Sequence, residues 1–328
     1  MKATSDSAVG ALSNDSAKKD LISAVTEPSK FLVNALSVPR REGVVEVDGC
    51  DIHYFAWGDP SKPPIIMMHG FLAHARCFAF IAPYLAQDYH VVAMDLSGMG
   101  DSGWRPSYSE PKRVEELMTV ARHNQLFDSQ TKPMIIAHSY GGRIGTAAMA
   151  AHADQFKGLI ICDLMIIRPS ILRANADKFS PSFKRDPNRA NRIYPDLDAA
   201  RARFVLSPPQ PVEQPELFDY MAYHSLRQVD GGWQWKFDPR LFDVSGQPKN
   251  GWESIGEDFV AAPGRKAIIY GAKSMLFTDD SVNYIGELVS KQKAQPIPIV
   301  AIPYARHHLM LDQPVAFITA LKSMLSMW

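Results

Sequence analysis

The sequence has few cysteines, no net charge and no long apolar run. Its three cysteines, Cys50, Cys77 and Cys162, are odd in number and lack the spacing of a zinc site, so neither a disulfide framework nor a structural metal is indicated. Basic and acidic residues balance at 35 each, which gives no reason to expect nucleic acid or an anionic membrane as a partner. No run approaches the roughly 18–20 apolar residues of a membrane span.

The N-terminal segment also lacks the apolar centre of a signal peptide. Its first fifteen residues, MKATSDSAVGALSND, are typical of a flexible tail, so we expect a cytoplasmic protein. The following stretch has apolar residues at mixed helical spacing and indicates one or two short helices. We therefore predict that residues 1–40 form a tail and short helices, which pack on the main domain or on a second subunit of a homo-oligomer.

What the sequence does have is a repeated alternation of strand and helix patterns. Its 328 residues, 46% of them hydrophobic, are enough for a large core. Two runs around a Val-Asp-Gly turn predict an antiparallel hairpin. Later continuous apolar runs are typical of strands buried on both faces: PPIIMMHG, HVVAMDL, PMIIAHS, GLIICDL, KAIIYG and PIVAIP. Helical periods separate these runs, which predicts an α/β fold with a mostly parallel sheet covered on both faces.

One stretch, from about 167 to 263, breaks this alternation. It has many prolines, few clear strands and a dense set of aromatic residues, and it is too long to be a simple loop in a compact domain. We predict that 167–263 forms an inserted, mainly helical cap between two core segments, 41–166 and 264–328. Within it, Trp233 and Trp235 are predicted to face the active site and bind substrate.

The stretch MIIAHSYGG places a serine at the end of an apolar run. A nucleophile on a tight strand-to-helix turn needs small residues two positions before and after it, and Ala137 and Gly141 meet that need around Ser139. An earlier strand ends in His-Gly-Phe. Acyl transfer requires two N–H donors for the oxyanion, and the backbones of Phe71 and Tyr140 are the natural pair.

The order of these sequence motifs resembles that of a known family. HG-x, D-x-x-G-x-G-x-S, small-His-Ser-x-Gly-Gly and a late histidine follow one another as in the α/β-hydrolase family, in its capped epoxide-hydrolase-like and esterase branch. The resemblance covers roughly 43–328. It implies an eight-stranded sheet, a cap over the active site and a Ser–acid–His triad in that chain order. It also implies that a serine nucleophile disfavours epoxide hydrolysis and dehalogenation, for which the family uses aspartate.

The catalytic histidine is expected in YARHHLMLDQP. A general base must lie on a loop after the last strand, from which its ring reaches back to the serine. In the family this histidine usually precedes the proline of the last helix by seven residues, which favours His307 over His308 because of its spacing to Pro314. Adjacent histidines in one loop point in different directions, so we predict no metal site here.

The acid of the triad is harder to place. Most relatives have it after the strand KAIIYG, at the position of Ser274, but a serine cannot stabilise an imidazolium as a carboxylate does. Asp279 and Asp280 follow, although both resemble the N-terminal cap of the next helix. Asp163 closes an apolar strand, where a carboxylate is costly unless paired, and some relatives place the acid there. We favour Asp163, with Asp279 or Asp280 as the alternative.

These residues together predict a serine hydrolase that acts without a cofactor on a small-molecule substrate. Ser139, Asp163 and His307 would form the triad of an enzyme that cleaves a carboxylic ester or a lactone through an acyl-enzyme. The aromatic cap favours a bulky apolar or aromatic substrate. Two alternatives stay open: a carbon–carbon hydrolase of a diketone-like substrate, and a non-catalytic small-molecule binding protein, to which a displaced acid would point.

Overall fold

The computed structural model describes residues 24–175, 185–243 and 251–328. The tail predicted for the first fifteen residues lies outside the described residues. The first complete helix is α2 (Lys30–Leu36), which begins after Ser29 because the Ser29 side chain accepts a hydrogen bond from the backbone N–H of Leu32. Its buried residues pack into one of the two cores that flank the main sheet.

The main sheet has eight strands in the order β1-β2-β4-β3-β5-β6-β9-β10. The strands are β1 (Arg40–Val47), β2 (Cys50–Trp57), β3 (Pro64–Met68), β4 (His90–Met94), β5 (Met134–His138), β6 (Gly158–Cys162), β9 (Arg265–Gly271) and β10 (Ile299–Ile302). β1 and β2 form an antiparallel hairpin and β2 runs antiparallel to β4, whereas every other neighbouring pair is parallel. The predicted eight-stranded, mostly parallel sheet is confirmed.

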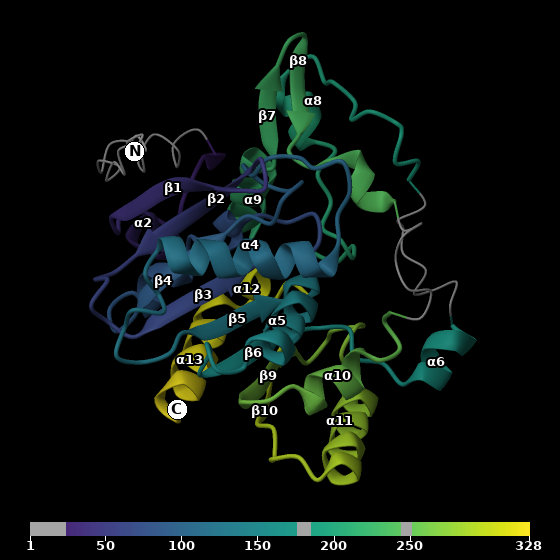
Figure 1. Cartoon of the computed structure of the whole chain (residues 1–328). Helices are drawn as coiled ribbons and strands as arrows, with labels where there is room; N and C mark the ends of the chain where they lie inside the picture. The colour runs from purple at the N-terminus through teal and green to yellow at the C-terminus, as the bar shows by residue number, and fades with distance from the viewer. Residues whose placement is uncertain (1–23, 176–184, 244–250) are drawn as a thin grey trace.

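Each central strand is buried on both faces, as its continuous apolar run predicts. In β3, Ile65 and Met67 pack into one core while Ile66 and Met68 pack into the other, because successive side chains of a strand point to opposite faces. Helices cover both faces in front of and behind the sheet (Figure 1). One layer contains α2, α3 (Ala82–Leu85) and α13 (Pro314–Ser326), and the other contains α4 (Glu110–His123), α5 (Tyr140–Ala151), α10 (Ile255–Ala261) and α11 (Asp279–Gln292).

The described part of 167–263 contains a hairpin as well as helices. Its elements are α6 (Pro169–Ala174), α8 (Leu197–Arg201), α9 (Pro215–His224), β7 (Leu226–Val229), β8 (Gly232–Trp235), the 3-10 turn η2 (Pro239–Phe242) and α10. Helices make up most of the regular structure in this described part, and the short hairpin is an element that the sequence analysis does not predict. Its turn depends on Gly231 and Gly232, both with positive φ, and a side chain on Gly232 would collide with the backbone oxygen of Tyr194.

These elements occupy two different places. The hairpin β7–β8 and helix α8 stand together at one end of the molecule, away from the large sheet (Figure 1). Helix α10, in contrast, packs against α5 and α11 in a helix layer of the sheet, although its residues fall inside the range predicted as cap. Two further short elements lie near the sheet, the 3-10 turn η1 (Ala75–Phe78) after β3 and helix α12 (Leu309–Asp312) before α13. Within the described ranges, every helix is too short or too polar to cross a bilayer.

Candidate active site

Ser139 occupies a strained turn between β5 and α5. Its backbone has φ 50° and ψ −120°, a left-handed conformation that residues with a side chain rarely adopt. The backbone N–H of Ser139 donates to the oxygen of Cys162 on the neighbouring strand β6 (2.9 Å), and the N–H of Gly142 donates to the Ser139 oxygen across the turn (2.8 Å). This geometry holds the side chain of Ser139 at the carboxyl edge of the sheet, which is the placement that a serine nucleophile needs.

The His-Gly-Phe segment after β3 lies directly against this turn. A side chain on Gly70 would approach the Cβ of Ser139 to 3.1 Å, and one on Gly141 would approach the His69 oxygen to 2.7 Å, so both positions require glycine. His69 is fully buried, accepts from the backbone N–H of Leu96 (3.0 Å) and therefore donates through Nδ1 to the Gly70 oxygen (2.7 Å). This histidine fixes the loop that carries Phe71, the predicted oxyanion donor.

The two predicted oxyanion residues are close neighbours. The rings of Phe71 and Tyr140 meet edge to face, with 5.8 Å between their centroids. Tyr140 is the first residue of α5, where the backbone N–H groups of the first turn have no partner inside the helix. The structure thus brings the chain around Phe71 to the helix start that follows Ser139.

Asp163 and His307 are in direct contact. Asp163 lies immediately after β6 and is fully buried, and its Oδ1 accepts a hydrogen bond from Nδ1 of His307 (2.8 Å). Its other oxygen, Oδ2, accepts from the backbone N–H of Gly271 at the end of β9 (2.8 Å). Because the carboxylate holds the Nδ1 proton, Nε2 of His307 is left as the basic nitrogen.

Ser274 supports this carboxylate instead of replacing it. The position at which the family resemblance places the acid holds Ser274, and its hydroxyl donates to Oδ1 of Asp163 (2.6 Å), the same oxygen that contacts His307. Sequence reasoning missed this role, although it singled out both residues. Ser274, which follows β9, and Asp163, which follows β6, therefore form a single hydrogen-bonded unit.

The alternative acids lie elsewhere. Asp279 and Asp280 are the first two residues of α11, and the cap of that helix is Thr278, so the sequence interpretation of the aspartates as the cap was wrong by one and two positions. Thr278 and Ser281 form a reciprocal capping box. Asp280 makes an ion pair with Arg168 (3.1 Å) on the surface.

Two further histidines surround His307. His138, the last residue of β5, donates from Nε2 to the backbone oxygen of His307 (2.9 Å), and the two rings are 4.7 Å apart. Burial, reinforced by His307 and His308, holds the pKa of His138 well below its usual value, so this ring is neutral. His138 therefore connects the strand that carries Ser139 to the loop that carries His307.

A cavity of about 380 Å³ lies beside these residues. Phe71, His138 and His308 contribute to its wall, and Ser139 and His307 are their sequence neighbours. Its lining is otherwise mostly apolar and comes both from the sheet edge and from the 167–263 segment, including Phe204, Leu206, Met221, Trp235, Phe237 and Phe242. Cavities of this size and character are typical of small-molecule sites.

The two tryptophans predicted to bind substrate are placed differently. Trp235 lines the cavity, but Trp233 is absent from its described lining. Trp233 pairs through its backbone with Tyr194 (2.8 Å) and packs in the small core of the hairpin with Ala200 and Leu226. Of the two tryptophans, only Trp235 therefore lies in the described lining of the cavity.

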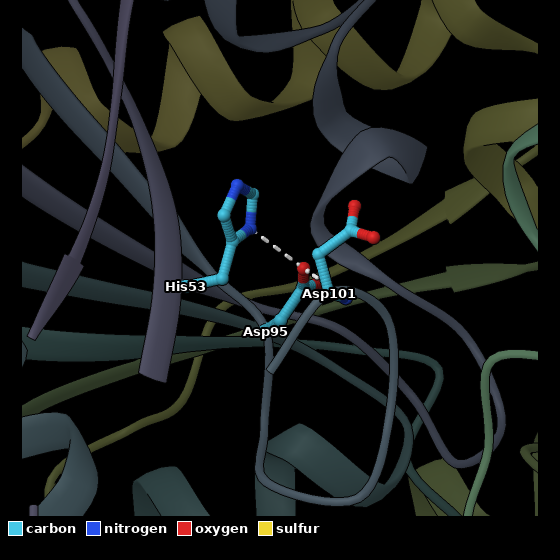
Figure 2. Close-up of side chains that lie close together, drawn as sticks. All are labelled: His53, Asp95 and Asp101. Atoms are coloured by element: carbon cyan, nitrogen blue, oxygen red, sulfur yellow. Dashed lines mark hydrogen bonds and ion pairs between the residues drawn. The ribbon is translucent and has the colours of Figure 1, made fainter. Parts of the chain in front are cut away.

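One cluster of His and acidic side chains in the described part of the chain is compact enough to consider for a metal, namely His53, Asp95 and Asp101 (Figure 2). Both ring nitrogens of His53 are already hydrogen-bonded, to Asp95 and Glu42 (2.8 Å each). Burial lowers the pKa of His53, but the hydrogen bonds to these two carboxylates outweigh it and raise the pKa to about 9. A protonated imidazole has no lone pair for a metal, so this cluster is an ion-pair network that anchors the loop after β4.

This network predicts a specific pH dependence of stability. The pKa of folded His53 lies above its ordinary value of 6.5, so its contribution is complete below pH 6.5 and is lost as the pH rises through about 9. We expect the free energy of unfolding, measured in urea, to fall by roughly 2–4 kcal/mol between pH 6.5 and 10 through this residue.

The His53→Gln variant should lack this part of the pH dependence, while His90→Gln should retain it. His90 is a suitable control because burial and Arg41 lower its pKa to about 4, so it does not titrate in this window. Equal slopes for the wild type and His53→Gln would contradict the assignment.

Known proteins resemble this chain in sequence and in fold. The model of the alpha/beta hydrolase family matches residues 65–320. The chain is 30% identical over 109 residues to a human serine hydrolase-like protein, covering 33% of this chain and 53% of that protein. It is 24% identical over 217 residues to lipase LipV of Mycobacterium tuberculosis, covering 65% of this chain and 74% of the lipase. An esterase structure from Mycobacterium tuberculosis superimposes with a TM-score of 0.65 at 19% identity, covering 96% of this chain and 98% of that one.

The chain spans about half the length of the serine hydrolase-like proteins of Homo sapiens (53%) and Danio rerio (58%). At 19% identity, the esterase structure establishes similarity of fold. The family match is broader, because residues 65–320 extend from β3 into α13 and include Ser139, Asp163 and His307. This chain therefore belongs to the α/β-hydrolase family.

Proposed function

We propose that this hydrolase cleaves a carboxylic ester or a lactone through an acyl-enzyme on Ser139. The observation that carries the proposal is the 2.8 Å hydrogen bond between Asp163 and Nδ1 of His307, on a loop that is bonded to His138, the residue before a serine in a left-handed turn. Nucleophilic catalysis by serine requires a base that is held in one tautomer, and Asp163 supplies that constraint.

In the proposed first half-reaction, Nε2 of His307 takes the proton of Ser139 while Oγ attacks the substrate carbonyl carbon. The backbone N–H groups of Phe71 and Tyr140 stabilise the oxyanion of the tetrahedral intermediate. Its collapse breaks the bond to the leaving alcohol, to which His307 returns the proton. The product of this half-reaction is an ester between the acyl group and Ser139.

The second half-reaction repeats these steps with water. Water attacks the acyl-enzyme as His307 removes its proton, and collapse of the second intermediate breaks the bond to Ser139 Oγ, to which His307 returns the proton as the acid is released. The carboxylate of Asp163 stabilises the imidazolium in both halves. For a lactone the same sequence opens the ring, so that alcohol and acid leave as one molecule.

The cavity supports a substrate with a bulky apolar or aromatic part. Phe204, Phe237 and Phe242 provide an apolar wall of rings that would contact such a group along its length. The lining also includes His138 and Phe71, which places this wall next to the proposed nucleophile and oxyanion donors.

The proposal is tested by turnover of a panel of aryl esters, alkyl esters, lactones and vinylogous diketones. We expect hydrolysis of aryl esters or lactones by the wild type, and none by Ser139→Ala. Cleavage confined to the diketones would show a carbon–carbon hydrolase. Binding of these compounds without turnover would show a non-catalytic binding protein.

The placement of the two tryptophans predicts a difference in substrate selectivity. Trp235→Ala enlarges the cavity, so the ratio of kcat/KM for a naphthyl ester to that for an acetate ester should change by about fivefold or more, through altered contacts to the bulky group. Trp233→Ala removes a ring of similar size from the same strand but outside the cavity lining, and should leave that ratio unchanged. Equal shifts in both variants would mean that the ratio responds to the hairpin's stability and not to the cavity.

A further inference from the structure

The charged side chains in the cavity lining are cationic. Three cationic side chains, Arg185, Arg203 and Lys236, contribute to its lining, and the described lining contains no aspartate or glutamate. Lys236 is neutralised by an ion pair with Asp101 (2.5 Å). The two arginines remain as charges that face an otherwise apolar space.

Arg185 has only neutral partners among the described residues. Its Nη2 donates to the side-chain oxygen of Asn191 (2.6 Å) and, at 3.4–3.5 Å, to the backbone oxygens of Arg189 and Ala190. Its Nε is buried and has no hydrogen-bond partner. Arg203 is exposed at the cavity and makes no ion pair with a described residue. Arg185 therefore brings to the cavity wall a positive charge that no carboxylate of the described residues neutralises.

Aromatic rings hold the Arg185 guanidinium and connect it to the active site. Its Cζ lies 5.1 Å from the ring centroid of Phe237 and 5.8 Å from that of Phe242. Phe242 in turn meets Phe71 edge to face, with 5.8 Å between centroids. A single aromatic ring thus separates the guanidinium from the residue whose N–H is proposed to bind the oxyanion.

An anion in the cavity would satisfy this arrangement. A partly buried cation without a carboxylate partner is costly, and burial, together with nearby Arg189, lowers the pKa of Arg185. A guanidinium presents its N–H donors in a planar fork that fits a carboxylate or phosphate group. The apolar rings between Arg185 and Phe71 fit a short hydrocarbon chain.

We propose that the cavity selects acyl substrates with an anionic group at the end remote from the scissile carbonyl, and that Arg185 binds this anion, with Arg203 adding attraction at the cavity surface. This inference rests on the serine-hydrolase function proposed above. The substrate class is an ester of an acyl chain that ends in a carboxylate or a phosphate.

The kinetic test compares two p-nitrophenyl esters of adipic acid. In one the remote carboxylate is free and charged, and in the other it is a neutral methyl ester. Wild type should prefer the anionic ester in kcat/KM. Arg185→Gln should reduce that preference about tenfold or more, as expected for loss of a hydrogen bond to a charged group, with little effect on the methyl ester. High salt should weaken the preference in the wild type.

Arg189→Gln is the matched control. It removes the same charge from a side chain that is four residues further along the chain and outside the described cavity lining. It should keep the full preference, and Arg203→Gln should reduce it less than Arg185→Gln does. A wild type that hydrolyses both esters equally, or equal losses in Arg185→Gln and Arg189→Gln, would overturn the proposal.

A binding experiment separates this inference from the proposed catalysis. Calorimetric titration with hexanoate, hexyl phosphate and hexanol needs no turnover, and the stronger of the two anions identifies the head group. At least one anion should bind more tightly than hexanol, and Arg185→Gln should abolish the difference. If that holds while no ester is hydrolysed, the cavity assignment stands and the hydrolase function fails. Equal binding of all three compounds would overturn the anion site even in an active esterase.

Discussion

The Ser139→Ala variant should lose at least about 1,000-fold in kcat/KM against any ester that the wild type hydrolyses. Only the hydroxyl is removed, and with it the atom that forms the acyl-enzyme. The backbone of residue 139 has φ 50° in either variant, and alanine, like serine, has a Cβ that makes this conformation costly. The melting temperature should therefore stay nearly unchanged.

Ser290→Ala provides the control for this experiment. Ser290 lies on the exposed part of α11, where its hydroxyl binds the Gly286 oxygen within the helix, so its loss should leave kcat/KM unchanged. Residual activity of Ser139→Ala above about a thousandth of the wild type would exclude Ser139 as the nucleophile.

Replacing Asp163 with asparagine should lower kcat by up to about 10,000-fold, by analogy with other triads. The amide has the shape of the carboxylate but does not carry its charge. It therefore cannot stabilise the imidazolium, and it favours the wrong tautomer of His307. Asp279→Asn and Asp280→Asn should change kcat little, because both residues lie in the first turn of α11 and Asp280 pairs with Arg168. Near-normal activity in Asp163→Asn would move the acid elsewhere.

The hydrogen bond between Ser274 and Asp163 allows a sharper test of the same claim. Since Ser274 Oγ lies 2.6 Å from the oxygen that contacts His307, a carboxylate at position 274 would lie near the same ring nitrogen. The double variant Asp163→Asn with Ser274→Asp should recover at least about tenfold of the lost kcat, whereas Asp163→Asn with Ser274→Ala should not. Equal activity of the two double variants would show that the charge near His307 is not what Asp163 supplies.

The sheet and the serine turn could be predicted because the interactions that determine them involve residues close together in the sequence. Continuous apolar runs such as PMIIAHS leave no polar face, so these strands must be covered on both sides. The turn at Ser139 is indicated by the small residues Ala137 and Gly141, and at Gly141 the close approach of Met68 and His69 leaves no room for a side chain. Each of these features can be identified from a few consecutive residues.

The hairpin β7–β8 could have been predicted from the sequence, but the sequence analysis does not predict it. Its turn signal, Asp-Gly-Gly between the short runs LRQV and WQW, lies in a stretch rich in prolines, which suggested loops and helices. The different roles of Trp233 and Trp235 could not be read at all. They are two positions apart and share a face of the strand, so only the position of β8 relative to the cavity separates them.

The support around the triad depends on contacts between distant segments. Ser274 and Asp163 are 111 residues apart, and His138 and His307 are 169 apart, so no local pattern reveals their hydrogen bonds. The choice of Asp163 over later acids was argued from the cost of leaving a carboxylate unpaired at the end of an apolar strand, from the serine at position 274 and from the family resemblance. The position of Arg185 beside the rings of Phe237 and Phe242 follows from the tertiary fold alone.

The central claim is that His307 and Asp163 activate Ser139 as a nucleophile, and the most direct test is covalent labelling with a fluorophosphonate followed by intact mass and peptide mapping. Only an activated serine reacts, whatever the natural substrate is. The account predicts one adduct per chain on Ser139 in the wild type and in His308→Ala, and none in Ser139→Ala or His307→Ala within the same time. A folded wild-type protein that stays unlabelled, or an adduct on any other residue, would contradict it.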